Sequence, residues 1–132
     1  MSSEPLTILA VGEAEERAIR SAVSSADVSL LGRGYRIAIA DDVPGLVALF
    51  SDPAVSDPIY DLPRPFTATV IGEWVEQARM RQQRGEAVLA VMCDDAGDIS
   101  GYSYFTVWPD RSAAEIAGAH RADTQNQGAG KA

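Results

Sequence analysis

The sequence is poor in cysteine and histidine, and each scarcity excludes a class of protein. Cys93 is alone, so it cannot form a disulfide within the chain, as expected of a protein that works in the reducing cytoplasm. His120 is also alone, and we expect no metal because a histidine-based site needs several ligands together. No apolar run approaches the roughly 20 residues that a membrane-spanning helix needs.

Positive charge is scarce as well. Lysine and arginine number 11 against 19 acidic residues, which gives a net charge of −8. Without a local basic patch, such a chain should bind neither nucleic acid nor an anionic membrane. Hydrophobic residues make up 46% of the 132 residues, enough to bury the core of one domain.

The first 34 residues differ in pattern from the rest of the chain. An apolar run over 6–11 predicts a short strand, and the spacing of small and apolar residues over 13–24 predicts a helix. Gly32 and Gly34 interrupt the pattern and mark a boundary. We interpret 1–34 as an N-terminal extension and 35–132 as the main domain.

The main domain reads as an α/β (α+β) fold, with a mixed, mostly antiparallel sheet flanked by helices in the order β-α-α-β-β-β. Asp41 or Asp42 is expected to cap the first helix, and Thr67 or Thr69 the second. The predicted elements are a strand over 35–40, a helix over 43–51, an irregular loop over 52–66, a long helix ending at Gly85, and strands over 87–93, 99–108 and 113–119.

Two side-chain patterns bear on a site. Alternation along 99–108 puts Tyr102, Tyr104, Thr106 and Trp108 on one face, and Ile99, Gly101, Ser103, Phe105 and Val107 on the other. The aromatic face could line a pocket or belong to the core. Arg79, Arg81 and Arg84 fall near the end of the long helix, where they complement its dipole.

A glycine-rich loop follows the last predicted strand. Gly128 and Gly130, in the stretch QNQGAGK, give room for backbone N–H groups to converge on a phosphate. A helix that began near Ala129 would add its positive end. Taken alone this motif is weak, because glycine-rich stretches are common and can also be disordered.

With this order of elements, the sequence resembles the GNAT superfamily of N-acetyltransferases, most closely its RimJ/RimL-type branch. Gln125, Gly128 and Gly130 match the family's Q/R-x-x-G-x-G/A loop, and AEIAGAHRAD resembles its fourth strand. YRIAIADDVPGLVALFSDPAV resembles its first strand and helix, and GEAVLAVMCDDAGDISGYSYF its second and third strands.

The resemblance implies transfer of an acetyl group from acetyl-CoA to a primary amine. It assigns the pyrophosphate to the loop Gln125, Asn126, Gln127, Gly128, Ala129, Gly130 and Lys131. It assigns the pantetheine and the acetyl carbonyl to Ala119, His120 and Arg121. It implies that Glu115 is the general base that takes the proton from the attacking amine; the alternative is a solvated strand carboxylate.

The acceptor, a small molecule or a peptide amine, stays undefined at this stage. The loop 52–66 corresponds to the acceptor region of the family and carries Asp57, Tyr60, Asp61 and Arg64. Nothing in the sequence chooses among these polar residues. Tyr60, Arg64 and Tyr104 are the substrate-contacting residues that we predict.

A complete domain of this family continues past the loop with further helices and strands, so we expect an incomplete GNAT fold. Three explanations stay open: a fragment that has lost activity, a chain completed by a partner, and a non-catalytic module. The last would associate through the open edge of strand 113–119, for example as a homo-oligomer. We expect the chain alone to bind acetyl-CoA weakly or not at all.

Overall fold

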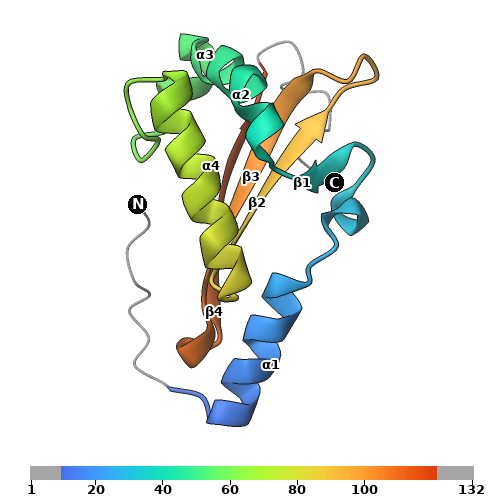
Figure 1. The fold of residues 1–132 in the computed structure, drawn as a ribbon, viewed down its shortest axis with the longest axis vertical. Coiled ribbons are helices and arrows are strands. Elements are labelled where there is room, and N and C mark those ends of the chain that lie inside the picture. The colour runs from blue at the N-terminus through green and yellow to red at the C-terminus, as the bar shows by residue number, and fades with distance from the viewer. Residues whose placement is uncertain (1–9, 122–132) are drawn as a thin grey trace.

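The computed structural model describes residues 10–121 (Figure 1). The described part contains four α-helices, four strands and three short 3₁₀ helices. The helices are α1 (Glu13–Ser24), α2 (Val43–Phe50), α3 (Pro53–Ser56) and α4 (Ala68–Gln83). The strands are β1 (Tyr35–Ile37), β2 (Ala87–Cys93), β3 (Ile99–Trp108) and β4 (Ala113–His120). The 3₁₀ helices are η1 (Val28–Leu31), η2 (Ala40–Asp42) and η3 (Pro109–Arg111).

The strands form one open sheet in the order β1-β2-β3-β4, and every neighbouring pair is antiparallel. The predicted fold class is confirmed: a partial α/β fold with helices flanking an open sheet. No parallel pair occurs among the described strands, so this part of the sheet is antiparallel throughout. β1 and β4 are the two edge strands of the described sheet.

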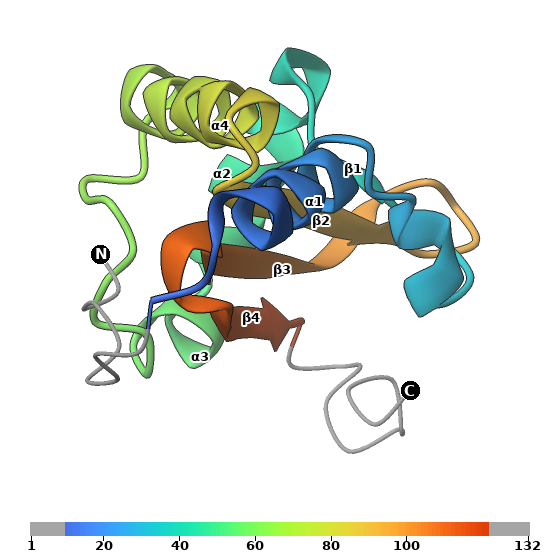
Figure 2. The ribbon, with the colours of Figure 1, turned by 90° about the horizontal axis from the view of Figure 1, so that it is seen from below.

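β2 is apolar along most of its length because both of its faces are covered. Leu89 and Val91 point to the face where α2 and α4 pack, and Val88 and Ala90 point to the opposite face. That opposite face is covered by the end of α1 and by η1, which contributes Val28. Figure 2 shows α4 and the sheet as two separate layers.

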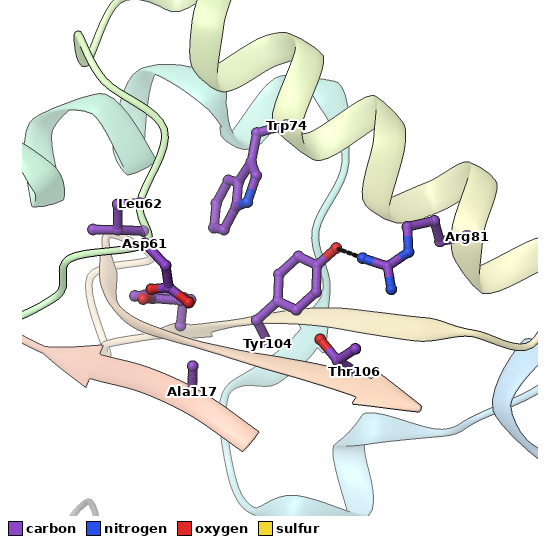
Figure 3. Close-up of a pocket in the computed structure, with 8 residues that line it drawn as sticks. Asp61, Leu62, Trp74, Arg81, Tyr104, Thr106 and Ala117 are labelled. Carbon is purple, nitrogen blue, oxygen red and sulfur yellow. Dashed lines mark hydrogen bonds between the residues drawn. The ribbon is translucent and has the colours of Figure 1, made fainter. Parts of the chain in front are cut away.

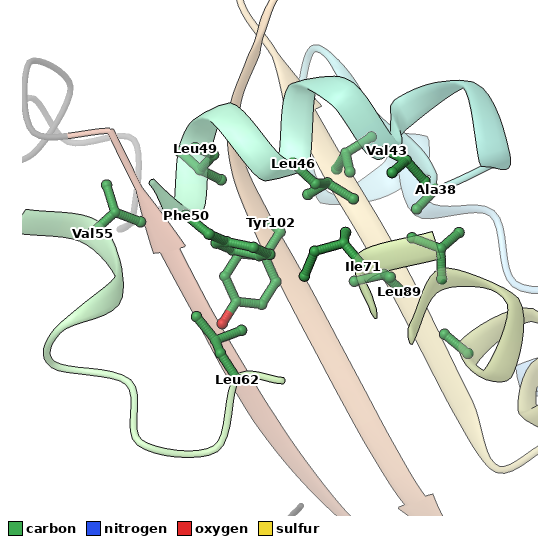
Figure 4. Packing of buried hydrophobic residues seen from close by; sticks show 13 residues of the cluster. Ala38, Val43, Leu46, Leu49, Phe50, Val55, Leu62, Ile71, Leu89 and Tyr102 are labelled. Atoms are coloured by element: carbon green, nitrogen blue, oxygen red, sulfur yellow. The ribbon is translucent and has the colours of Figure 1, made fainter. Parts of the chain in front are cut away.

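The main core lies between the sheet and the layer of α2 and α4 (Figure 4). Its largest fully buried side chains are Phe50, Leu46, Ile71, Val55, Val75 and Val91. Phe50 is the centre of an aromatic cluster, with ring centroids 5.6 Å from Phe66, 5.6 Å from Trp74 and 5.3 Å from Tyr102. Rings packed at these distances favour one arrangement, so the cluster fixes how α2, α4 and β3 meet.

Local signals decide the ends of the long helix. The hydroxyl of Thr67 accepts a hydrogen bond from the N–H of Val70 (3.2 Å), which confirms the predicted cap. Gly85 follows the helix with φ of 75°, a conformation that suits glycine.

α1 occupies the predicted range Glu13–Ser24. Residues 6–9 of the predicted first strand lie outside the described residues.

Three local expectations were wrong. The Asp42 carboxylate does not cap α2, because it binds the guanidinium of Arg36 and accepts a hydrogen bond from the Ile39 N–H (2.8 Å). The loop 52–66 is not wholly irregular, since α3 lies within it. A bulge at Ser100 turns Ile99 toward the α2 side of the sheet, whereas strict alternation would have put it on the other face.

We predict that Gly85→Ala destabilises the fold by more than about 2 kcal/mol. A β-carbon there would meet the backbone of Arg20 in α1, in addition to the strain of a positive φ. Gly97→Ala is the matched control, because Gly97 also has a positive φ but faces open space, so strain alone costs about 1–2 kcal/mol. Urea denaturation measures both, and equal losses would show that α1 does not dock against this turn.

Candidate functional site

A small cavity opens on the α4 side of the sheet, above β3 and β4 (Figure 3). It is lined by Asp61, Leu62, Trp74, Arg81, Tyr102, Tyr104, Thr106 and Ala117. These residues come from the loop before α4, from α4 itself, and from the two strands. The cavity volume is about 30 Å³, room for about two water-sized groups.

Aromatic rings form the walls of this cavity. Trp74 and Tyr104 are stacked, with centroids 5.6 Å apart and an interplanar angle of 26°. The Trp74 ring meets Tyr102 edge-on at 5.7 Å, and Phe50 packs behind both rings. Ring faces with a core behind them hold their shape, so the cavity presents a preformed surface to a ligand.

Several polar groups point into the cavity without a partner among the described residues. Tyr102 and Thr106 are 2% and 5% exposed, yet neither hydroxyl makes a hydrogen bond within the described part of the chain. Neither hydroxyl oxygen is closed off from solvent, so both can hydrogen-bond to water or to a ligand in the cavity. Burial and the nearby charge of Asp61 raise the pKa of Tyr102, which keeps its hydroxyl protonated.

The hydrogen-bond pattern of β4 determines which of its peptide groups face outward. The N–H of Arg121 donates to the carbonyl of Ser100 (2.7 Å), and the pairing of β3 with β4 continues in the same register. In an antiparallel ladder, hydrogen-bonded pairs alternate with non-bonded pairs. The peptide groups of Ala117 and Ala119 therefore face β3, whereas those of Ile116 and Gly118 face the open edge of the described sheet.

Glu115 lies beside the cavity and not in its wall. It pairs with Thr106, so its side chain emerges on the α4 side of the sheet, two residues along β4 from Ala117. The Glu115 side chain is exposed. The structure thus places Glu115 on the same face of the sheet as the aromatic cavity, and its role as a base stays a prediction.

The segment assigned to pantetheine is the end of β4. Ala119 pairs with Tyr102 and packs against the main core, while His120 pairs with Gly101 and points to the opposite face from the cavity. Burial lowers the pKa of His120. Arg121 ties this end of β4 to the turn between β2 and β3 through an ion pair with Asp94 (2.9 Å).

The predicted acceptor residues have three different environments. Tyr104 lines the cavity, and its hydroxyl accepts a hydrogen bond from Arg81 (3.1 Å). Tyr60 is 85% exposed and does not line the cavity. Arg64 donates to the carbonyls of Leu62, Ser56 and Ile59, so it shapes the loop. The cavity is reached instead by Asp61, the polar residue of that loop that sequence reasoning could not choose.

The predicted phosphate loop, Gln125 to Lys131, lies outside the described residues. Over residues 10–121, no cluster of three or more histidine, cysteine or acidic side chains could hold a metal ion. Over the same residues, no helix combines the length and the apolar character needed to cross a bilayer.

Three solved structures share the architecture described above. The ribosomal-protein-S5-alanine acetyltransferase from Vibrio fischeri matches with a TM-score of 0.61 and 15% identity, over 74% of this chain and 57% of its own. The GNAT superfamily phosphinothricin acetyltransferase (Pat) from Sinorhizobium meliloti, in complex with acetyl-CoA, matches with a TM-score of 0.55 and 15% identity. The match covers 74% of this chain and 52% of that protein's chain.

The third structure is yncA from Salmonella typhimurium, named as an acetyltransferase and solved with its cofactor acetyl-CoA. It matches with a TM-score of 0.53 and 16% identity, over 74% of this chain and 56% of its own. No family model and no curated protein matches the sequence. The chain spans little more than half the length of the three solved structures.

The described residues therefore have a partial GNAT acetyltransferase fold, which confirms the predicted likeness at the level of fold. The likeness is one of fold, and it does not single out the RimJ/RimL branch. At 15–16% identity, this likeness of fold identifies neither the catalytic residues nor the substrate of this chain.

We predict that Tyr102→Phe leaves the free energy of unfolding within about 0.5 kcal/mol of the wild type, because its hydroxyl has no internal hydrogen bond to lose. Tyr104→Phe is the matched comparison and should cost about 1 kcal/mol, since it removes the bond from Arg81. Urea denaturation measures both variants. A larger loss in Tyr102→Phe would mean that its hydroxyl is satisfied within the protein and is not available to a ligand.

Proposed function

We propose that the chain carries the acceptor half and the strand edge of an acetyl-CoA-dependent N-acetyltransferase site. The observation that carries this proposal is that the aromatic cavity and the edge strand β4 meet at one residue. Ala117 lines the cavity and belongs to β4. Its neighbours Ile116 and Gly118 direct their peptide groups to the open edge. A ligand on the edge and a ligand in the cavity would therefore meet beside Ala117.

The edge of β4 fits the chemistry of the pantetheine arm. That arm carries amide groups, and an extended amide chain can add to a sheet edge as another strand does. Ile116 and Gly118 each offer an outward N–H and C=O for this purpose. When bound, acetyl-CoA supplies an activated acetyl group as a thioester.

The cavity fits an amine acceptor. Its walls are the faces and edges of Trp74, Tyr102 and Tyr104, and aromatic faces attract cations. The carboxylate of Asp61 lies in the same wall and attracts an ammonium group. An amine held there is an ammonium at neutral pH and must lose a proton before it can act as a nucleophile.

Glu115 is the side chain that we assign to this proton transfer. It is on the cavity side of β4, two residues from Ala117, and its exposure lets a water molecule relay the proton. His120 points to the other face of the sheet and is not used in this proposal.

A proline substitution tests the strand edge. Ile116→Pro removes one outward N–H without breaking the ladder to β3, because proline is tolerated where the N–H faces away from the sheet. We expect it to weaken acetyl-CoA binding by about tenfold in calorimetry, the worth of one hydrogen bond. Ile116→Val keeps the N–H and should bind as the wild type does.

The proposal for this chain is contradicted if millimolar acetyl-CoA gives no heat with the wild type, or if Ile116→Pro binds as tightly as Ile116→Val. Circular dichroism checks that both variants remain folded.

The role of Glu115 is tested by measuring the rate of acetyl transfer from acetyl-CoA to an amine. The reaction is followed by the free thiol of coenzyme A that it releases. Glu115→Gln should lower the rate by about 10²–10⁴-fold, the usual contribution of a general base, and should leave acetyl-CoA binding unchanged. Glu76→Gln, on the exposed side of α4, is the matched control and should keep the full rate. If the two variants have equal rates, Glu115 takes no part in the proton transfer.

A second function is favoured by one observation. Ile116, in the middle of the edge strand, is 68% exposed, and an edge with an exposed apolar side chain can pair with another chain. A second copy bound at this edge would compete with acetyl-CoA for the same peptide groups. Light scattering distinguishes the two functions: a dimer that acetyl-CoA does not dissociate favours the association module.

A further inference from the structure

The first half of β4 has peptide groups at the edge of the described sheet. The alternation that turns the peptide groups of Ile116 and Gly118 outward also turns those of Ala114 outward, two residues nearer the start of the strand. No described residue pairs with this edge, because β4 is the last strand in the order of the sheet. Ala114 is exposed. An unpaired edge of this kind favours pairing with a further extended segment.

One backbone hydrogen bond brings the N-terminal part of the chain to this edge. The N–H of Val11 donates to the carbonyl of Asp110 (2.9 Å), in the η3 turn that leads into β4. The dark-blue start of the described chain runs from α1 past the orange turn between β3 and β4, to the side of that turn away from α1 (Figures 1 and 2). A segment that precedes Val11 therefore begins beside the start of β4, and it would pass along the edge as an antiparallel partner.

Residues 6–9 have the composition of a strand. They read Leu-Thr-Ile-Leu, and they belong to the apolar run over 6–11 that predicts a short strand. They lie outside the described residues, whereas the end of that run, at Ala10 and Val11, lies within them. Four extended residues span about 13 Å at about 3.3 Å each, which is about half the length of the eight-residue strand β4.

We propose that residues 6–9 form a further antiparallel strand on the first half of the β4 edge. Counted from the hydrogen bond between Val11 and Asp110, Thr7 lies opposite Ala114, and these two residues exchange N–H···O=C hydrogen bonds. Pro5 precedes the segment and has no N–H to donate, so the ladder ends before it reaches further along β4.

This strand divides the edge of β4 into two parts. The chain itself closes the first part, and the outward peptide groups of Ile116 and Gly118 stay open to a ligand or to another chain. The N-terminal extension thereby limits how much of the edge can pair with a second copy. The inference goes beyond the proposed function and does not rest on it, because it concerns the protein without a ligand.

Hydrogen exchange of the full 132-residue chain without acetyl-CoA tests the strand. Each rate is first divided by the intrinsic rate of that amide. The Ala114 N–H should then exchange at least tenfold more slowly than the Ile116 N–H, because only the first has a partner. A nuclear Overhauser effect between the Cα protons of Leu6 and Glu115, which form the adjacent non-bonded pair, checks the register.

Two proline variants separate this pairing from a general effect of proline. Thr7→Pro removes the N–H that donates to Ala114 and should raise the exchange rate of Ala114 to that of Ile116. Ile8→Pro is the matched control, because the Ile8 N–H faces away from β4, and it should leave Ala114 protected. Slow exchange of Ala117 in both variants shows that the ladder between β3 and β4 is intact.

Three results would overturn the inference. The first is exchange of Ala114 as rapid as that of Ile116 in the wild type. The second is protection of Ala114 that persists in Thr7→Pro, which would mean that another group covers it. The third is protection that rises with protein concentration, which would assign this part of the edge to a second copy. Because acetyl-CoA is left out, none of these results bears on its binding at Ile116 and Gly118.

Discussion

The register between β3 and β4 is the constraint on which the rest of the site depends. It places Tyr102, Tyr104 and Thr106 opposite Ala119, Ala117 and Glu115, all on the side of the sheet that faces α4. The same register directs the peptide groups of Ile116 and Gly118 to the open edge. A slip of one residue would exchange the two faces of β4 and separate Glu115 from the cavity.

The aromatic cluster connects this register to the helical layer. Phe50 of α2 and Trp74 of α4 both contact the ring of Tyr102 in β3. The rings therefore act both as core and as the walls of the cavity. The rigidity that stabilises the fold also positions Asp61 and Arg81, which come from the two ends of the segment that includes α4. A site built on such a core is organised before a ligand arrives.

Much of the fold could be predicted from the sequence, because it is encoded locally. The range of α1, the cap at Thr67 and the limits of β2 and β3 follow from spacing, side-chain chemistry and turn residues. The predictions were wrong where a tertiary contact competed with a local one. Asp42 binds Arg36 across the β1–η2 turn instead of capping α2, and a bulge turns Ile99 to the other face.

The site was predictable only in part, for the same reason. Glu115 and Tyr104 could be placed on one face because strands alternate. Asp61 could not be selected from a loop with four polar candidates, since only the folded loop shows which of them reaches the cavity. For Arg81 the sequence predicted only that its charge complements the dipole at the end of the helix. Its hydrogen bond to Tyr104, 23 residues away in the chain, has no signal in the local sequence.

Residue-resolved hydrogen exchange along β4 tests the central claim most directly. In the free protein, the amides of Ala117 and Ala119 should exchange slowly and those of Ile116 and Gly118 rapidly, because only the first two donate to β3. Acetyl-CoA should then slow Ile116 and Gly118 and leave the other two unchanged. Uniform exchange along the strand, or slowing of the already protected amides alone, would contradict the register and the site built on it.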